Sequence, residues 1–98
     1  MIEIAARVQW IKEECGGRRH PAEIGYRPVI RWVRHGDKFP SGHLSAQVQE
    51  MVDTDHADVS IVRLSFFVED GVPEDWLASG ERIELTEVYK VVAVGVIV

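Results

Sequence analysis

The chain has 98 residues, of which 46% are hydrophobic and 28% are charged, and its formal net charge is −5. This length fits one domain with one hydrophobic core, and the composition is typical of a globular protein and not of a disordered one. An acidic total disfavours tight non-specific binding to nucleic acid, which depends on neutralising phosphates. We therefore expect a single domain over residues 1–98.

The charges are distributed unevenly along the chain. Residues 1–38 carry eight Lys/Arg and five Asp/Glu, whereas residues 39–98 carry three Lys/Arg and eleven Asp/Glu. The single cysteine, Cys15, allows no intrachain disulfide, which fits a reducing cytoplasm. The start lacks a signal-peptide pattern, and the longest apolar run, residues 91–98, is too short to span a bilayer. A soluble, cytoplasmic protein without a membrane partner is expected.

Hydrophobic residues alternate with polar ones at a period of two, which is typical of β-strands with one buried face. A final run of β-branched residues adds a strand that is apolar throughout. Gly-Gly, Gly-Asp and Asp-Gly turn signals separate these segments, so the chain is predicted to be all-β, a barrel or a sandwich. The predicted strands are residues 2–10, 26–34, 44–49, 59–68, 82–86 and 91–98.

Outside these strands, only residues 73–79 have the pattern of a helical turn, with Pro73 at its start and Gly80 after its end. Trp76 lies beside two acidic residues in this segment. We expect it to be partly exposed, which makes it a candidate anchor for a protein partner. The side chains expected in the core are Ile4, Val8, Trp10, Ile30, Trp32, Leu64, Phe66 and Val94.

Two segments of the chain resemble the C-terminal domain of elongation factor Tu. The first is a glycine-arginine hairpin motif that leads into a Gly-Tyr-Arg-Pro strand start. The second is the stretch 83–97, which matches the register of the family's last two strands. The resemblance covers essentially the whole chain and implies a closed six-stranded antiparallel β-barrel of Greek-key type. The first motif matches at Gly16, Gly17, Arg18, Pro21, Gly25, Tyr26, Arg27 and Pro28.

In that family the domain contacts the T-stem of aminoacyl-tRNA, packs on the GTPase domain and meets the nucleotide-exchange factor. This chain has no Gly-x-x-x-x-Gly-Lys-Ser/Thr phosphate loop, so we expect neither nucleotide binding nor GTP hydrolysis. By position, Arg18 matches a family arginine near the RNA-binding edge. Arg19 stands where the family has histidine, and His20 stands where it has threonine.

The second turn of the resemblance, residues 87–90, departs from the family pattern. Val88 and Tyr89 replace two glycines, and Lys90 replaces an arginine. Glycines there let a phosphate backbone approach closely, and a Val-Tyr pair would obstruct that approach. Any RNA affinity is therefore expected to be weak and sensitive to salt.

The basic residues of the hairpin allow two interpretations. As a binding edge for RNA or a protein, they would use the match between guanidinium groups and phosphate or carboxylate geometry. In the favoured alternative, Arg18 and Arg27 pair with carboxylates such as Glu13, Glu14 or Glu87 and brace the hairpin. The candidate binding residues are Arg18, Arg19, His20, Arg27, Lys90 and Trp76.

An acidic connection between two predicted strands is the best candidate metal site. It lacks the glycine and the terminal glutamate of a calcium-binding loop, so we interpret it as a solvated turn and expect no metal or other cofactor. Its four potential ligands are Asp53, Asp55, His56 and Asp58.

The preferred hypothesis is a stand-alone, non-catalytic interaction module that docks on a protein. A partner in translation is implied only by the resemblance. The alternative is an accessory RNA-binding domain that uses the basic first third of the chain. A small metal-dependent or hydrolytic enzyme is least favoured, because no paired carboxylates, metal triad or nucleophile constellation stands out.

Overall fold

The structure is a computed structural model that describes residues 2–18, 22–35, 43–67, 72–87 and 90–98. This part of the chain forms β-strands and two single 3₁₀ turns, which confirms the predicted all-β class. The 3₁₀ turns are η1 (Glu13–Cys15) and η2 (Glu74–Leu77). The strands are β1 (Ile2–Trp10), β2 (Val29–Trp32), β3 (His43–Asp53), β4 (Val59–Phe66), β5 (Arg82–Glu87) and β6 (Lys90–Ile97).

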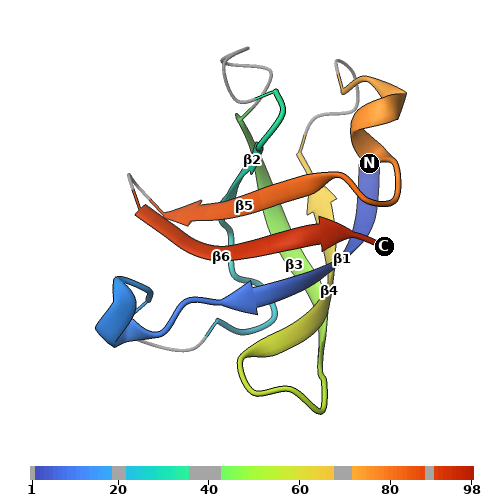
Figure 1. Ribbon diagram of the computed structural model, residues 1–98. Helices are drawn as coiled ribbons and strands as arrows, with labels where there is room; N and C mark the ends of the chain where they lie inside the picture. Colours follow the sequence, from blue (N-terminus) through green and yellow to red (C-terminus); the bar gives the residue numbers. More distant parts are fainter. Residues whose placement is uncertain (1, 19–21, 36–42, 68–71, 88–89) are drawn as a thin grey trace.

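The strands form one antiparallel sheet that closes on itself (Figure 1). They are hydrogen-bonded in the order β1-β4-β3-β2-β5-β6, and β6 pairs with β1 to complete the ring. Each described strand therefore has a neighbour on both sides. A closed sheet of this kind leaves no strand edge for another chain to extend.

Alternation along the strands fills the interior of the ring. On β1, for example, Ile4, Ala6 and Val8 are buried, whereas Glu3 and Arg7 are exposed. Trp10, at the end of this strand, is partly buried and packs against the core. The remaining core predictions are confirmed except for Val94. The buried residues among them are Ile4, Val8, Ile30, Trp32, Leu64 and Phe66.

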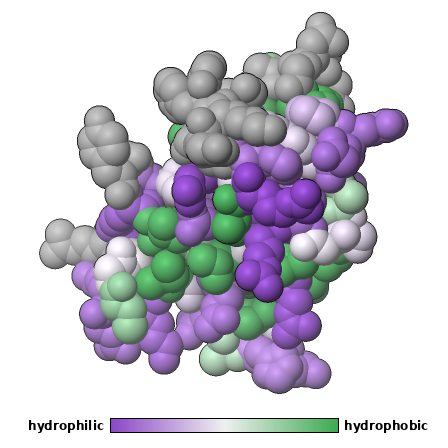
Figure 2. All heavy atoms as spheres, turned by 45° about the horizontal axis from the view of Figure 1, so that its top comes forward, coloured by the Kyte–Doolittle hydropathy of each residue, from purple (hydrophilic) through white to green (hydrophobic). Residues whose placement is uncertain are grey.

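Val94 was predicted to lie in the core, and this prediction is wrong. The pairing of β5 with β6 shifts register between Leu85 and Thr86, which is a β-bulge. As a result Val92 and Ala93 are both buried, and the alternation resumes one position later, with Val94 exposed. Apolar side chains consequently reach the surface among hydrophilic ones (Figure 2).

β2 is shorter than the predicted strand over residues 26–34. Pro28 precedes its first residue, and proline has no backbone N–H for a sheet ladder. At the other end the backbone N–H of His35 donates to the carbonyl of Trp32, at 3.1 Å, which turns the chain. The predicted strand therefore keeps only its central four residues.

Trp76 was predicted to be partly exposed, and this prediction is also wrong. It lies in η2 and is only 4% exposed. Its carbonyl accepts a hydrogen bond from Nε1 of Trp32 at 2.8 Å, and the centroids of the two rings lie 5.5 Å apart. The ring of His35 stacks on it with a centroid distance of 4.3 Å. Trp76 thus closes one end of the core and is not a surface anchor for a partner.

Candidate functional site

The glycine pair of the hairpin motif has two separate structural roles. Gly16 ends η1 with a φ of 95°, a left-handed conformation that favours glycine. Gly17 is buried against the preceding backbone, and a Cβ at this position would lie 1.7 Å from the carbonyl oxygen of Ile11. Its backbone N–H donates to the carbonyl of Lys12 at 2.9 Å. The fold therefore favours glycine at position 16 and leaves no room for a side chain at position 17, whether or not a ligand binds nearby.

Arg18 lies across the ring of Tyr26, with its guanidinium carbon 4.0 Å from the ring centroid. Its Nε is 3.2 Å from Oε2 of Glu87, and the hydroxyl of Tyr26 donates to the same oxygen at 2.8 Å. These three side chains, which we call the Arg18 cluster, join two regions far apart in the sequence: the hairpin motif, which holds Arg18 and Tyr26, and the end of β5, which holds Glu87. The predicted pairing of Arg18 with a carboxylate is confirmed, and its partner is Glu87.

The surroundings of Tyr26 raise the pKa of its phenol. Burial is the largest cause, followed by the hydrogen bond to Glu87 and by the negative charge of that carboxylate, while Arg18 acts in the opposite direction. The phenol therefore keeps its proton and remains a hydrogen-bond donor well above neutral pH.

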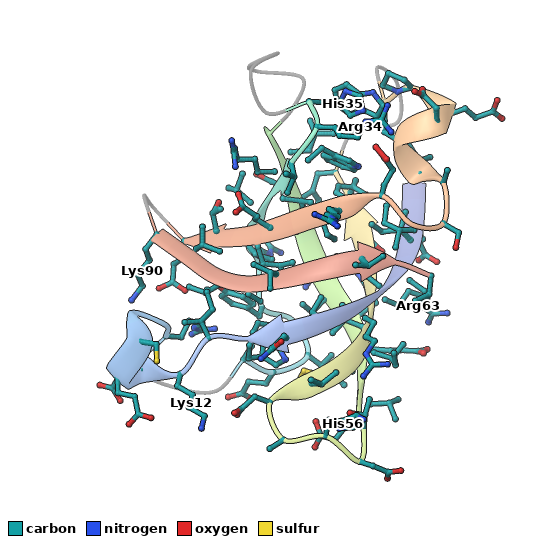
Figure 3. All side chains as sticks on the ribbon, in the orientation of Figure 1. Lys12, Arg34, His35, His56, Arg63 and Lys90 are labelled. Atoms are coloured by element: carbon teal, nitrogen blue, oxygen red, sulfur yellow. The ribbon has the colours of Figure 1, made fainter. Side chains whose placement is uncertain are left out.

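Lys90 provides a second link between the same two regions. Its Nζ donates to the carbonyl oxygen of Gly17 at 3.2 Å. Figure 3 shows Lys90 at the start of β6, on the side of the molecule where η1 lies. The β5–β6 hairpin is thus joined to the glycine-arginine segment both by Lys90 and by Glu87. Both described cations of this region make contacts within the protein.

Arg27 does not contact Glu87 or Gly17, the residues that Arg18 and Lys90 contact. Arg27 is exposed, and its guanidinium carbon lies 5.2 Å from the ring centroid of Phe67. The predicted pairing of Arg27 with Glu13, Glu14 or Glu87 does not occur among the described residues. Five residues of the two matched segments lie outside the described residues: Arg19, His20, Pro21, Val88 and Tyr89.

The candidate metal ligands Asp53, Asp55, His56 and Asp58 lie at the β3–β4 connection. Asp53 accepts a hydrogen bond from the hydroxyl of Ser60, and the carboxylate of Asp58 lies 3.9 Å from Nζ of Lys12. In the part of the chain that the structure describes, no three His, Cys, Asp or Glu side chains are close enough to hold a metal ion. The structure shows a hydrogen-bonded turn at this position, with His56 toward its tip (Figure 3).

A hollow of about 580 Å³ lies between this turn and the segment around η1. Trp10, Met51 and Val92 supply its apolar lining. Nε1 of Trp10 donates to the hydroxyl of Ser60 at 3.2 Å, and that hydroxyl donates to Asp53. Trp10, Ser60 and Asp53 therefore form a hydrogen-bonded chain at the hollow, and Ser60 is held as a structural hydroxyl.

A different surface lies on the outer side of β1, β6 and β5, over a hollow of about 470 Å³. Val96 of β6 pairs with Arg7 of β1 on one side and with Arg82 of β5 on the other. The backbone N–H of Val33 donates to the carbonyl of Arg82 at 3.1 Å, so Val33 continues the line of cross-strand neighbours Arg7, Val96 and Arg82. We call Arg7, Val33, Arg82, Val94 and Val96 the arginine–valine face.

The arginine–valine face is exposed and its charges lack partners within the described chain. Val33, Val94 and Val96 are 45%, 44% and 41% exposed. Arg7 and Arg82 are exposed and make no ion pair with a described residue. Sequence reasoning did not single out this surface, because its location depends on strand pairing and on the bulge in β6.

Comparison of the sequence with protein-family models gives no match, and comparison with curated proteins gives none either. Within the described ranges, no helix is long and apolar enough to cross a membrane. The fold and the geometry of its surface are therefore the basis on which a function can be proposed.

Proposed function

We propose that the chain is a non-catalytic interaction module that docks on a protein partner through the arginine–valine face. The observation that carries this proposal is the combination of three exposed valines with two arginines that make no ion pair with a described residue. Apolar side chains that gather on a surface within a polar rim are typical of protein interaction sites.

The closed ring restricts how a partner can bind. Each described strand is paired on both sides, so a partner cannot add a strand to the sheet, as many peptide-binding domains allow. Contact must instead be made by side chains that point outward from the strands. Because paired strands hold the backbone in place, the ordering required on binding is confined to the side chains.

We also propose that the ring is a Greek-key barrel of the elongation factor Tu C-terminal type. The strand order supports this, since β2, β3 and β4 are successive neighbours and β1 lies beside β4. The structural roles of Gly16, Gly17 and Arg18 supply a reason for the matched motif that involves no RNA. In this proposal the motif stabilises the domain, and the partner, which the resemblance associates with translation, binds elsewhere.

RNA binding has less support. Of the described cations expected at an RNA-binding edge, Arg18 and Lys90 contact Glu87 and Gly17, whereas Arg27 is exposed without an ion pair to a described residue. Two arginines on the arginine–valine face could neutralise few phosphates, and the slope of affinity against salt would be correspondingly small.

The proposal can be tested by capture of partner proteins from cells that contain this protein. The tagged chain would be compared with Val94→Asp and with the matched control Ile24→Asp. Ile24 is a suitable control because it is 66% exposed and lies far from the arginine–valine face. Its neighbour Gly25 donates a hydrogen bond to β3, and β3 is three strands from β6 in both directions around the ring. All three proteins should have the same circular dichroism spectrum.

We expect the wild type and Ile24→Asp to capture the same protein, and Val94→Asp to lose it. Aspartate at position 94 would place a negative charge beside Val96 and bury it at an apolar interface, which is unfavourable. The loss of capture should therefore be specific to this face. Equal capture by all three proteins, or recovery of RNA without protein, would contradict the proposal.

A further inference from the structure

We infer that the segment that docks on the arginine–valine face is an acidic polypeptide rich in aliphatic side chains. This inference rests on the proposed function and specifies the chemistry of the partner. It follows from three features of the face: its local charge, the position of its arginines relative to its valines, and the absence of aromatic side chains among its five residues.

Positive charge gathers on this face of an acidic molecule. Arg7, Arg31 and Arg82 lie on the outer side of β1, β2 and β5. The one acidic residue among their cross-strand neighbours and those of Val94 and Val96 is Glu84, which pairs with Arg31. The whole chain, in contrast, has a net charge of −5. An acidic partner is therefore attracted to this face and repelled by the molecule as a whole, which orients the encounter.

The register places an arginine on each side of Val96. Arg7 and Arg82 are its direct cross-strand neighbours, and since adjacent strands lie about 4.8 Å apart, their backbones are separated by roughly 10 Å. The aliphatic stems of both arginines extend the apolar surface, while their guanidinium groups remain in water at its rim. A segment with aliphatic side chains over the valines and carboxylates on either side would match both.

A polypeptide fits these features better than a nucleic acid does. Valine side chains offer no aromatic surface on which a base could stack. Guanidinium groups bind carboxylates in a bidentate manner, and two such contacts are a substantial part of a small protein interface. RNA binding depends on neutralising many phosphates, so two contacts would be only a small part of an RNA interface. We therefore assign the face to an acidic segment of a protein.

The test is a comparison of two labelled synthetic peptides by fluorescence anisotropy at low ionic strength. One peptide carries Leu and Glu in an amphipathic helical pattern, and in the other each Glu is replaced by Gln. We expect the Glu peptide to bind about tenfold more tightly, and the difference to shrink as salt screens the charges. The double variant Arg7→Gln/Arg82→Gln should lose the preference.

Arg27→Gln is the matched control, because it removes an exposed arginine that lies near Phe67 and outside the face. It should bind both peptides as the wild type does. Equal affinity for the two peptides, or an unchanged preference in the double variant, would overturn the inference. If either of these outcomes occurs and Val94→Asp still loses the captured protein, the proposed docking on this face stands. Only the acidic character of the partner is then refuted.

Two other occupants would also overturn the inference. A single-stranded RNA that displaces the Glu peptide at physiological salt would assign the face to nucleic acid. A dimer in light scattering that the double variant dissociates would assign it to a second copy of this chain. In contrast, a monomer that prefers the Glu peptide and retains that preference when RNA is added supports the acidic segment.

Discussion

The Arg18 cluster and the arginine–valine face both place arginine beside large apolar or aromatic side chains, yet they differ in what neutralises the charge. Arg18 is held by Tyr26 and Glu87 within the protein, whereas Arg7 and Arg82 point outward without a described carboxylate. The conspicuous glycine-arginine motif thus serves the fold. The surface available to a partner consists of residues at ordinary alternating positions.

The largest effect is expected at Gly17, where the motif meets the backbone of Ile11. In Gly17→Ala, the new Cβ would lie 1.7 Å from the carbonyl oxygen of Ile11, so the two segments must separate. Because neither backbone can yield without losing hydrogen bonds, we expect the free energy of unfolding to fall by about 3 kcal/mol or more. Denaturant unfolding followed by tryptophan fluorescence would measure this change.

Gly16→Ala is the matched control for Gly17→Ala. A Cβ at Gly16 would meet nothing within 4 Å, so only the left-handed φ of 95° opposes alanine there. We expect a loss of about 1 kcal/mol. Equal losses in the two variants would show that the packing of Gly17 on Ile11 is not what makes the motif structural.

The next largest effect is expected from Glu87→Gln, which removes the charge that joins Arg18 and Tyr26. Both contacts are partly exposed, so solvent screening keeps the expected loss of unfolding free energy to about 1 kcal/mol. The matched control is Glu14→Gln, which removes an exposed carboxylate that makes no ion pair with a described residue. A Glu87→Gln variant as stable as the control would remove the distinction between the two regions.

The raised pKa of Tyr26 predicts a loss of stability at alkaline pH. Below pH 10, the usual pKa of tyrosine, the folded and unfolded states both keep the proton, and the contribution of Tyr26 is fully present. Above that pH the unfolded state releases the proton while the folded state retains it, so the free energy of unfolding falls as the pH rises.

This pH dependence is best measured in a Tyr89→Phe background, so that Tyr26 is the only tyrosine that titrates. Denaturant midpoints would be compared with those of Tyr26→Phe/Tyr89→Phe at increasing pH. The background protein should lose stability more steeply above pH 10 than the double variant. Parallel curves would mean that the cluster does not hold the phenol in its neutral form.

Much of the fold could be predicted from the sequence, because strand periodicity needs only local information. Residues 2–10 alternate clearly, and β1 has those bounds. The exposure of Val94 could not be predicted, because residues 91–98 are nearly all apolar and show no alternation. Which of them point inward depends on the bulge beside Leu85. The burial of Trp76 also depends on a distant contact, the hydrogen bond from Trp32.

The candidate sites were less predictable, for the same physical reason. The Gly16–Gly17–Arg18 motif and its pairing with a carboxylate could be proposed from local residues. Glu87 was among the carboxylates proposed for Arg18, but the hydrogen bond from Tyr26 to the same carboxylate was not, because Tyr26 and Glu87 are 61 positions apart and meet only when the ring closes. The position of Val96 between two arginines depends on the register of three strands.

The smallest effect on stability is expected at the arginine–valine face. Arg82→Gln removes an exposed charge without a described ion-pair partner, so the free energy of unfolding should change by no more than about 0.5 kcal/mol. The same holds for Arg7→Gln. A clear destabilisation in denaturant unfolding would mean that these arginines serve the fold and are not available to a partner.

The most direct test of the central claim is to measure both unfolding free energy and Glu-peptide affinity for Arg18→Gln and Arg82→Gln. Because Arg18 contacts Tyr26 and Glu87, Arg18→Gln should lose about 1 kcal/mol of stability and keep the wild-type affinity. Arg82→Gln should keep its stability and bind the peptide several-fold more weakly. The reverse pattern, with affinity lost in Arg18→Gln and unchanged in Arg82→Gln, would contradict the assignment of a structural role to the first region and a binding role to the second.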